Sequence, residues 1–368
     1  MSGASETSLP KTIAKKVAPF VMAAATALMP DAKVVPHPTI DSPNLSHLAG
    51  QETREALQQL PANVIMIDFA PNELKEGIRQ TIFPDEEAIN SANIPGAIKD
   101  YIISRFGTHG ENVATVIHRI WERLGFTADV NMYPLQNILD FQNVESGQDE
   151  LGNQEYFLSI DAGKIAEVLQ QYPNQKVVNL SLQLGKIGFS MIEHERRIVG
   201  SVNYPTDVIL PDGRVQYYSP ENELITQTRE EYQEYKRRLE EDASETVTLS
   251  QPYPKLTEAY SKEDLQKNLP QLFALCRAFP DKLFVAAAGN EGENLEAIPD
   301  RPPNLLLVAE WNGVDKRPEQ EVYGADVYID NEELTIPHGS SFSSPVVSAL
   351  GSILTVQGLT PKEIKQKS

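Results

Sequence analysis

The sequence predicts an α/β protein with a mostly parallel central sheet flanked by helices and one large insertion. Three observations support this class. From residue 63 onward, short β-like runs alternate with segments of helical periodicity. Several of these runs are mostly apolar, which is typical of parallel strands buried on both faces. About a hundred residues separate two of the runs, whereas a crossover between parallel strands needs only about a dozen.

The predicted elements follow in chain order. The first strand covers residues 63–68 and ends in an acid, and a helix with one apolar face covers 109–124 and ends at Gly125. The other predicted strands are 128–135, 176–181, 282–288, 305–309 and 326–329, and the other helices are 161–170, 261–278 and 341–354. This strand–helix–strand order indicates a single large α/β domain over 61–368, preceded by an N-terminal segment over 1–60.

The insertion is predicted at about 184–260. It contains a helix over 228–242 that begins with a capping box formed by Thr228 and Glu231. Residues 221–245 hold nine acids and four bases, a net charge of 4 − 9 = −5. Two interpretations stay open: a flap or partner surface, or a solvated helix in an inserted subdomain.

Composition excludes several functional classes. The 368 residues include 52 acids and 32 bases, a formal net charge of −20, so a phosphate-binding surface for nucleic acid and attraction to anionic membranes are both disfavoured. The single cysteine, Cys276, excludes an internal disulfide and a Cys-based zinc cluster. Its apolar surroundings predict a buried, unreactive thiol.

The N-terminal segment resembles a secretory signal. Lys11, Lys15 and Lys16 precede 13 mostly apolar residues, 17–29, a run too short to span a bilayer. Glu6 and Pro19 argue against a signal and favour a packed helix. If residues 17–29 are the apolar region of a signal, the expected location is secreted or periplasmic; the alternative is cytoplasmic.

Four polar residues occupy positions where open parallel sheets gather functional side chains. Asp68 ends a strand, His109 begins a helix, Asn290 follows a strand and Ser341 begins the last helix. Together they supply a nucleophile, its base, an acid to orient the base and an oxyanion donor, which are the parts needed for acyl transfer.

The sequence here resembles a known family, the subtilisin-like serine proteases. Four segments carry the resemblance in the family's order, VIMID at 64–68, GTHGENVAT at 107–115, FVAAAGNEG at 284–292 and GSSFSSPVVS at 339–348, and VVNLSL at 177–182 is a fifth, weaker match. The resemblance implies a three-layer subtilisin-like fold. It also implies a triad of Asp68, His109 and Ser341, with Asn290 in the oxyanion hole. The substrate-binding residues it implies are Asn179, Leu180, Ser181, Leu182 and Gly289.

The sequence departs from the family near several of these residues. Phe69 and Ala70 follow the aspartate, and Gln183 stands where the family has glycine, which leaves the primary specificity pocket undefined. Calcium is common in the family, but no Asp-rich ligand spacing appears here, so we expect no cofactor and keep calcium only as an option. His338 borders the nucleophile motif, and we expect a role within its loop.

The predicted function is a serine endopeptidase that acts on peptide or protein substrates. Two alternatives remain: a binding module of the same fold whose cleft the insertion blocks, and an esterase or acyl transferase that uses the same triad.

Overall fold

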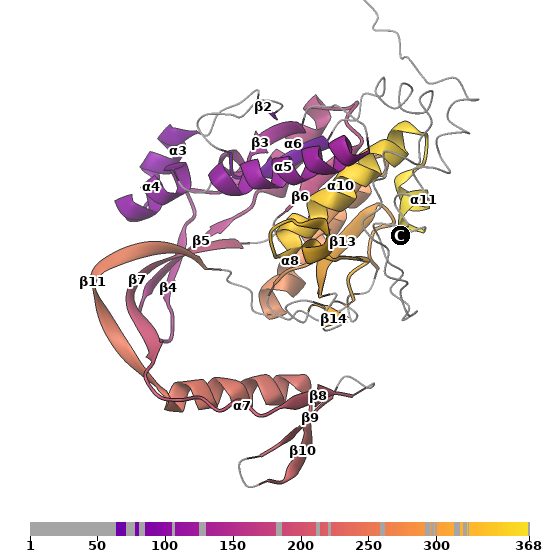
Figure 1. Ribbon diagram of the computed structural model, residues 1–368. Coiled ribbons are helices and arrows are strands. Elements are labelled where there is room, and N and C mark those ends of the chain that lie inside the picture. Colours follow the sequence, from indigo (N-terminus) through magenta and orange to yellow (C-terminus); the bar gives the residue numbers. More distant parts are fainter. Residues whose placement is uncertain are drawn as a thin grey trace, which may run out of the picture. The chain divides into compact units, whose positions relative to one another are not determined.

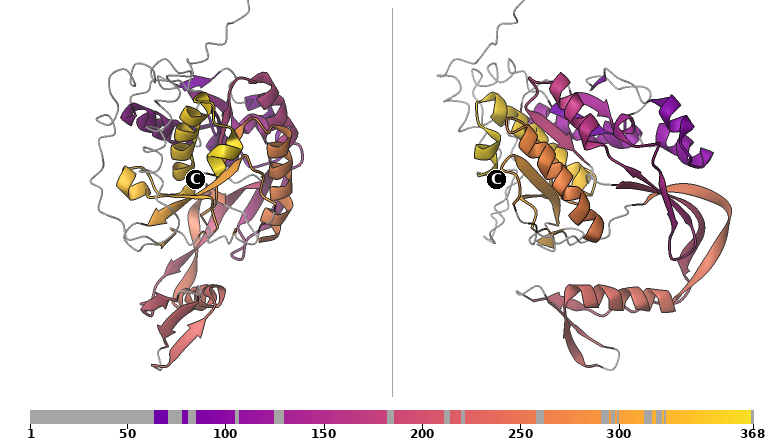
Figure 2. Two further views of the ribbon diagram at one scale, coloured as in Figure 1. Left: turned by 90° about the vertical axis from the view of Figure 1, so that its right-hand side faces the viewer. Right: turned by 180° about the vertical axis from the view of Figure 1, so that it is seen from behind.

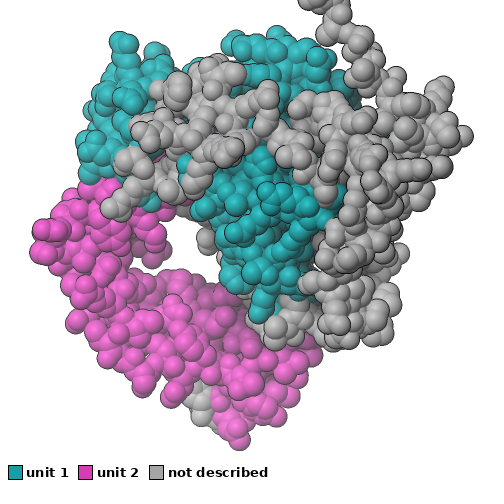
Figure 3. All heavy atoms as spheres, turned by 45° about the horizontal axis from the view of Figure 1, so that its top comes forward, with its two compact units in different colours: residues 1–144, 158–187, 258–368 teal, residues 145–157, 188–257 magenta. Residues whose placement is uncertain are grey.

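The computed structural model describes residues 64–70, 78–80, 85–104, 107–124, 130–181, 186–210, 214–219, 222–257, 262–290, 295, 298, 300–312, 317–318, 322 and 324–366. The chain forms two compact units, coloured separately in Figure 3. Unit 1 comprises residues 1–144, 158–187 and 258–368, and unit 2 comprises 145–157 and 188–257. The signal-like run at 17–29 lies outside the described residues. The boundaries predicted from the sequence, 61–368 with an insertion at about 184–260, stay predictions.

Unit 1 is built on a mostly parallel sheet, which confirms the predicted fold class. Its strand order is β14-β13-β12-β6-β1-β3-β2, and β15 also pairs with β13. The bounds are β14 Arg317–Pro318, β13 Leu305–Asn312, β12 Leu283–Ala287, β6 Val177–Leu180, β1 Val64–Asp68, β3 Val130–Pro134, β2 Ile78–Gln80 and β15 Val327–Ile329. Only the pairing of β13 with β14 is antiparallel among the described pairs of this sheet.

Helices cover both faces of this sheet (Figures 1 and 2). On one face, α5 (Gly107–Arg123) and α10 (Ser340–Val356) share a buried apolar cluster with side chains of β1, β3, β12 and β13. The Trp121 indole N–H donates to the Ala349 carbonyl and the Ser352 hydroxyl, which ties α5 to α10. On the other face lie α6 (Ala162–Gln171) and α8 (Lys262–Ala278). Successive strand residues point to opposite faces, so fully buried strands such as β1 suit a sheet covered on both sides.

Shorter helical elements complete unit 1. They are α3 (Glu86–Ser91), α4 (Gly96–Ser104), η2 (Leu135–Ile138), α9 (Asn331–Leu334) and α11 (Pro361–Lys365). None of the described helices is long and apolar enough to cross a membrane.

The strand order reverses between β1 and β6. From β1 the sheet continues through β3 and β2 on one side, and through β6, β12 and β13 on the other. In open α/β sheets the carboxyl ends of the strands at such a reversal form the usual ligand-binding position. Asp68 ends β1 and Ser181 follows β6, so the topology directs attention to the same edge as the sequence motifs.

Unit 2 contains two small sheets and one helix. One sheet has the order β11-β7-β5-β4, and the other has the order β10-β9-β8. The bounds are β4 Glu145–Gln148, β5 Gln154–Ser159, β7 Lys186–Ile198, β8 Asp207–Ile209, β9 Val215–Tyr218, β10 Leu224–Gln227, α7 Arg229–Asp242 and β11 Ser244–Thr257. Buried Val215, Tyr217 and Tyr232 form a small core, against which Tyr235 packs.

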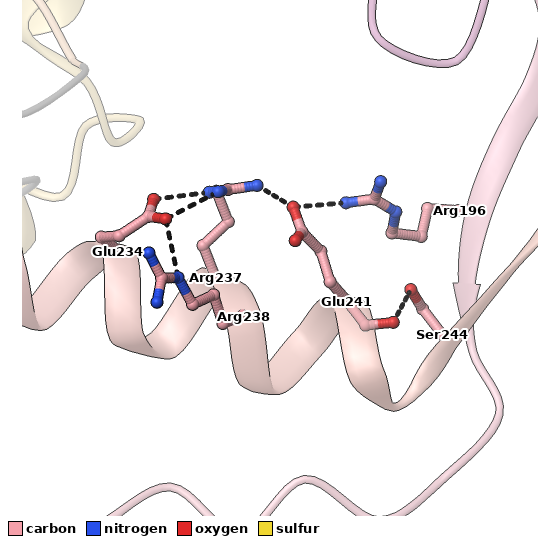
Figure 4. Close-up of polar contacts among 6 residues, drawn as sticks. All are labelled: Arg196, Glu234, Arg237, Arg238, Glu241 and Ser244. Atoms are coloured by element: carbon pink, nitrogen blue, oxygen red, sulfur yellow. Dashed lines mark hydrogen bonds and ion pairs between the residues drawn. The ribbon is translucent and has the colours of Figure 1, made fainter.

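Helix α7 is stabilised by its cap and by ion pairs on its surface. The predicted capping box of Thr228 and Glu231 is present. Glu234 pairs with Arg237 at 2.8 Å and Arg238 at 2.9 Å, and Glu241 pairs with Arg237 and with Arg196 of β7 (Figure 4). These contacts fix α7 to the strand beside it within unit 2.

Candidate active site

Asp68 and His109 form the central pair of the candidate site. The Asp68 carboxylate is fully buried at the end of β1, and its Oδ1 lies 2.8 Å from His109 Nδ1. A carboxylate only accepts hydrogen bonds, so an ionised Asp68 places the imidazole hydrogen on Nδ1 and leaves Nε2 as an acceptor. The His109 side chain is 25% exposed, which leaves the ring accessible to a reacting group.

A glycine allows the helix to approach the strand. A Cβ on Gly110 would lie 2.2 Å from the carbonyl oxygen of Phe69, so only glycine fits where α5 passes the end of β1. This close approach brings His109, the preceding residue, within reach of Asp68.

The segment after β1 is held by further hydrogen bonds. Asp68 Oδ1 also accepts the N–H of Phe69 at 2.7 Å. The buried Gln136 side chain accepts the N–H of Ala70 at 3.1 Å and donates to its carbonyl at 3.0 Å. The carboxylate is therefore held by the backbone that follows it, and Phe69 and Ala70 are part of this support.

Ser341 lies in the first turn of α10. The helix begins after Gly339, whose φ of +112° is one that residues with side chains rarely adopt. The ring of the next residue, Phe342, lies 5.4 Å from the His109 ring, measured between centroids. The first N–H groups of a helix have no intrahelical acceptor, and the Ser341 N–H is one of these groups.

Asn290 lies beside the same turn. A Cβ built on Gly339 would lie 3.6 Å from Ser341 Oγ and 3.8 and 3.9 Å from the Asn290 amide oxygen and nitrogen. The amide oxygen accepts both the N–H and the hydroxyl of Ser340 at 2.9 Å. These two bonds orient the Asn290 amide with its oxygen toward Ser340. The NH₂ group therefore faces away from Ser340, where it can donate a hydrogen bond.

The residues expected to bind substrate have a different environment. Asn179 and Ser181 are buried, and their side chains bond to each other and to Ser344 and Ser348 of α10. These side chains therefore join β6 to α10. The backbone of Asn179 pairs with both β1 and β12, so β6 itself is not an open strand edge. The Gly289 N–H donates to the Ser340 hydroxyl at 3.3 Å, and Leu182 lies outside the described residues.

Two residues that bond to Gly339, in the turn before Ser341, were not predicted from the sequence. Glu310, in β13, accepts the N–H of Gly339, and Asn331, at the start of α9, donates to the carbonyl of Gly339. Glu310 follows an apolar strand run just as Asp68 does, and that pattern could have identified it. Asn331 carries no comparable signal.

Cys276 is the single cysteine of the chain. Burial raises the pKa of the Cys276 thiol far above its ordinary value, which confirms the predicted unreactive thiol. Among the described residues there is no group of three histidine, cysteine or acidic side chains that could hold a metal ion.

Comparisons with known proteins give only distant similarities. No family model and no curated protein matches the chain. Among solved structures, the prenylagaramide maturation protease PagA is similar at 13% identity and a TM-score of 0.35, with 86% of this chain and 85% of that chain covered. The self-cleaved protease domain of PatA is similar at 14% identity and a TM-score of 0.34, with 83% of this chain and 85% of that chain covered. The PatG macrocyclase in complex with peptide is similar at 11% identity and a TM-score of 0.33, with 88% of this chain and 84% of that chain covered. Similarity at this level does not establish a family.

Proposed function

We propose that this protein is a serine endopeptidase of the subtilisin-like type, with Ser341 as nucleophile. The observation that carries the proposal is the 2.8 Å bond between buried Asp68 and His109, formed at the carboxyl edge of the sheet beside the turn that presents Ser341. A buried acid that orients an imidazole next to a serine is the arrangement acyl transfer requires.

The chemistry assigns one role to each group. Nε2 of His109 takes the proton of Ser341 Oγ as this oxygen attacks the scissile carbonyl. The His109 imidazolium is stabilised by Asp68, and it then gives its proton to the leaving amine. Water attacks the acyl-enzyme by the same route, which releases the carboxylic acid product and restores the serine.

The developing oxyanion has two candidate donors. One is the Asn290 NH₂ group, and the other is the N–H of Ser341. Both are preorganised, the first by the bonds from Ser340 to the amide oxygen and the second by the helix. The Asn179 backbone already pairs with β1 and β12, so the substrate backbone is proposed to lie extended beside the segment that follows β6, from Ser181 onward, pairing as an added strand.

These steps use only side chains and backbone of this chain. Calcium remains possible as a bound structural ion without a role in them. Export is proposed from the signal-like run at 17–29, with a cytoplasmic location as the alternative. Mass-spectrometric determination of the mature N-terminus distinguishes the two.

Cleavage assays test the proposed function. Purified wild-type protein is expected to hydrolyse casein and members of a peptide library, and Ser341→Ala is expected to hydrolyse neither. Turnover of short-chain esters without peptide cleavage would favour the esterase alternative. Binding of peptides without turnover of either substrate would favour a binding module.

A further inference from the structure

The loop that precedes Ser341 is held by side chains from two elements besides Asn290. Glu310 comes from β13 and Asn331 from α9, so side chains from three different segments meet at residues 337–340. These contacts surround Gly339, the residue whose left-handed backbone starts α10.

Glu310 carries a buried carboxylate that is 4% exposed. Its Oε2 accepts the N–H of Gly339 at 2.5 Å, and its Oε1 lies 2.6 Å from Nδ1 of His338. Both contacts suit an ionised carboxylate, which accepts one hydrogen bond from the backbone and one from the imidazole when Nδ1 of His338 carries the proton. Hydrogen bonds to ionised groups are about twice as strong as neutral ones, so this contact is well suited to fixing the peptide between His338 and Gly339.

Asn331 holds the next peptide. Its amide nitrogen donates to the carbonyls of Pro337 at 2.9 Å and Gly339 at 3.1 Å, and its oxygen accepts the Ser343 hydroxyl at 2.9 Å. The N–H of Gly339 is therefore fixed by Glu310 and its carbonyl by Asn331. A backbone in a rarely populated conformation persists when its surroundings determine it in this way.

We propose that Glu310 is a positioning residue for the nucleophile: it sets the Gly339 peptide and thereby the places of Ser341 Oγ and the oxyanion donors. This inference rests on the proposed role of Ser341. Glu310 acts through the loop and not on substrate, so its loss should lower kcat and leave KM nearly unchanged. A displacement of about 1 Å at a reacting atom can cost on the order of 10²-fold in rate.

Three substitutions grade the effect. Glu310→Gln keeps an acceptor for the Gly339 N–H, and we expect it to retain most of the wild-type kcat. Glu310→Asp withdraws the carboxylate by one methylene and should lower kcat by about tenfold, whereas Glu310→Ala removes the acceptor and should lower it by about 10²-fold. Each variant is assayed for kcat and KM on a cleaved peptide, for the rate of labelling by a fluorophosphonate probe, and for thermal unfolding.

Asp326→Asn is the matched control. Asp326 is a partly buried carboxylate that bonds the Leu307 N–H of β13 and pairs with Arg301 and Lys365. The Asp326→Asn substitution should lower thermal stability without changing the kcat of the folded protein. If Glu310→Ala fails to fold, the kcat and labelling rate of Glu310→Asp still test the positioning role of Glu310.

The outcomes separate this inference from the proposed function. The positioning role is supported if the wild type is labelled at Ser341 and Glu310→Asp shows a lower kcat and slower labelling. Glu310→Gln should then restore both the kcat and the labelling rate. Equal labelling and equal kcat in wild type and all folded Glu310 variants would overturn it and leave Ser341 as nucleophile. A wild type that is not labelled at Ser341 would overturn the proposed function and the positioning role together.

Discussion

Asp68 is the residue whose charge the proposed chemistry needs most directly. Its Oδ1 forms hydrogen bonds with both the Phe69 N–H and His109 Nδ1. Asp68→Asn preserves the size of the side chain but removes the charge that stabilises the imidazolium, so we expect kcat to fall on the order of 10⁴-fold. Steady-state kinetics and thermal unfolding check this expectation. A folded Asp68→Asn variant with near wild-type kcat would contradict the role of Asp68.

Asn290 is expected to act on the transition state and not on substrate binding. Its amide oxygen is used by Ser340, and its NH₂ group is the proposed oxyanion donor. Asn290→Ala should therefore lower kcat by about 10²–10³-fold and change KM little. The split between kcat and KM on one peptide substrate is the measurement. A rise in KM alone would assign Asn290 to substrate binding instead.

The residues proposed to react could be predicted from the sequence, but those that hold them could not. Asp68, His109, Asn290 and Ser341 each lie in a short local motif. Asn331 bonds to residues six to twelve positions away, but Glu310 and Gln136 reach partners 28 to 66 positions distant. Which polar side chain meets which backbone group at such distances depends on the strand order, which one sequence does not specify.

The junction of β1 with α5 depends on a glycine that has no room for a side chain. A Cβ on Gly110 would meet backbone, the Phe69 carbonyl, at 2.2 Å, whereas a Cβ on Gly351 of α10 would meet the flexible end of Leu283 at 2.6 Å. Gly110→Ala should therefore displace α5 and lower both kcat and thermal stability. Gly351→Ala should be tolerated better, because a leucine terminus can move. Kinetics and thermal unfolding of the two variants provide the comparison, and equal effects would contradict it.

Helix α7 should show a pH-dependent stability that comes from Glu234. Hydrogen bonds from Arg237 and Arg238 lower the pKa of Glu234 to about 2. Since the folded pKa lies below the unfolded one, the stabilisation is present above the unfolded pKa, about 4.3, and is lost as the pH falls toward 2. The pair is exposed, so the effect is small and weakens with salt.

Hydrogen exchange of the α7 amides tests this expectation. Glu234→Gln should exchange faster than wild type at neutral pH and low salt, and the difference should shrink as the pH approaches 2. Glu240→Gln, on the same helix and bonded to the Tyr204 hydroxyl, is the control. A difference that persists unchanged at low pH would contradict the assignment to Glu234.

Regular elements with strong periodicity were predicted closely, and the strands of unit 2 were not. The sequence places strands and helices within a few residues of β1, α5, β6, β12 and α10. It does not predict β11, which contains Pro252 and Pro254. The structure explains the difference: β11 is an edge strand with an irregular register between Thr248 and Tyr253, and such strands tolerate proline.

The insertion offers a test of the molecule as a whole. Ile198 and Ser244 are register partners of β7 and β11, so a two-residue Asn-Gly turn could join them and replace residues 199–243. The removed segment has its own small core of Val215, Tyr217 and Tyr232. We therefore expect the shortened protein to keep the fold of unit 1 and its activity on a small peptide reporter.

The same deletion decides between interpretations of the insertion. Of the seven exposed large hydrophobic side chains in the described part of the chain, it removes five: Val199, Tyr204, Val208, Tyr218 and Leu224. Reduced cleavage of protein substrates with unchanged peptide cleavage would favour a partner surface. Unchanged cleavage of both would favour a solvated subdomain, and activity that appears only after deletion would favour a blocked cleft.

The acidic character of the chain does not explain the proposed chemistry. The net charge of −20 disfavours a nucleic-acid partner, and the proposed reaction depends on a few neutral and paired groups at one edge of the sheet. The central claim is thus that Ser341 is an activated nucleophile.

The most direct measurement is the site of covalent labelling by a fluorophosphonate probe, determined by intact mass and peptide mapping. The structure predicts a single adduct on Ser341, greatly slowed labelling in a His109→Ala variant and none in Ser341→Ala. An unlabelled wild type, or an adduct that persists unchanged in Ser341→Ala, would contradict the claim.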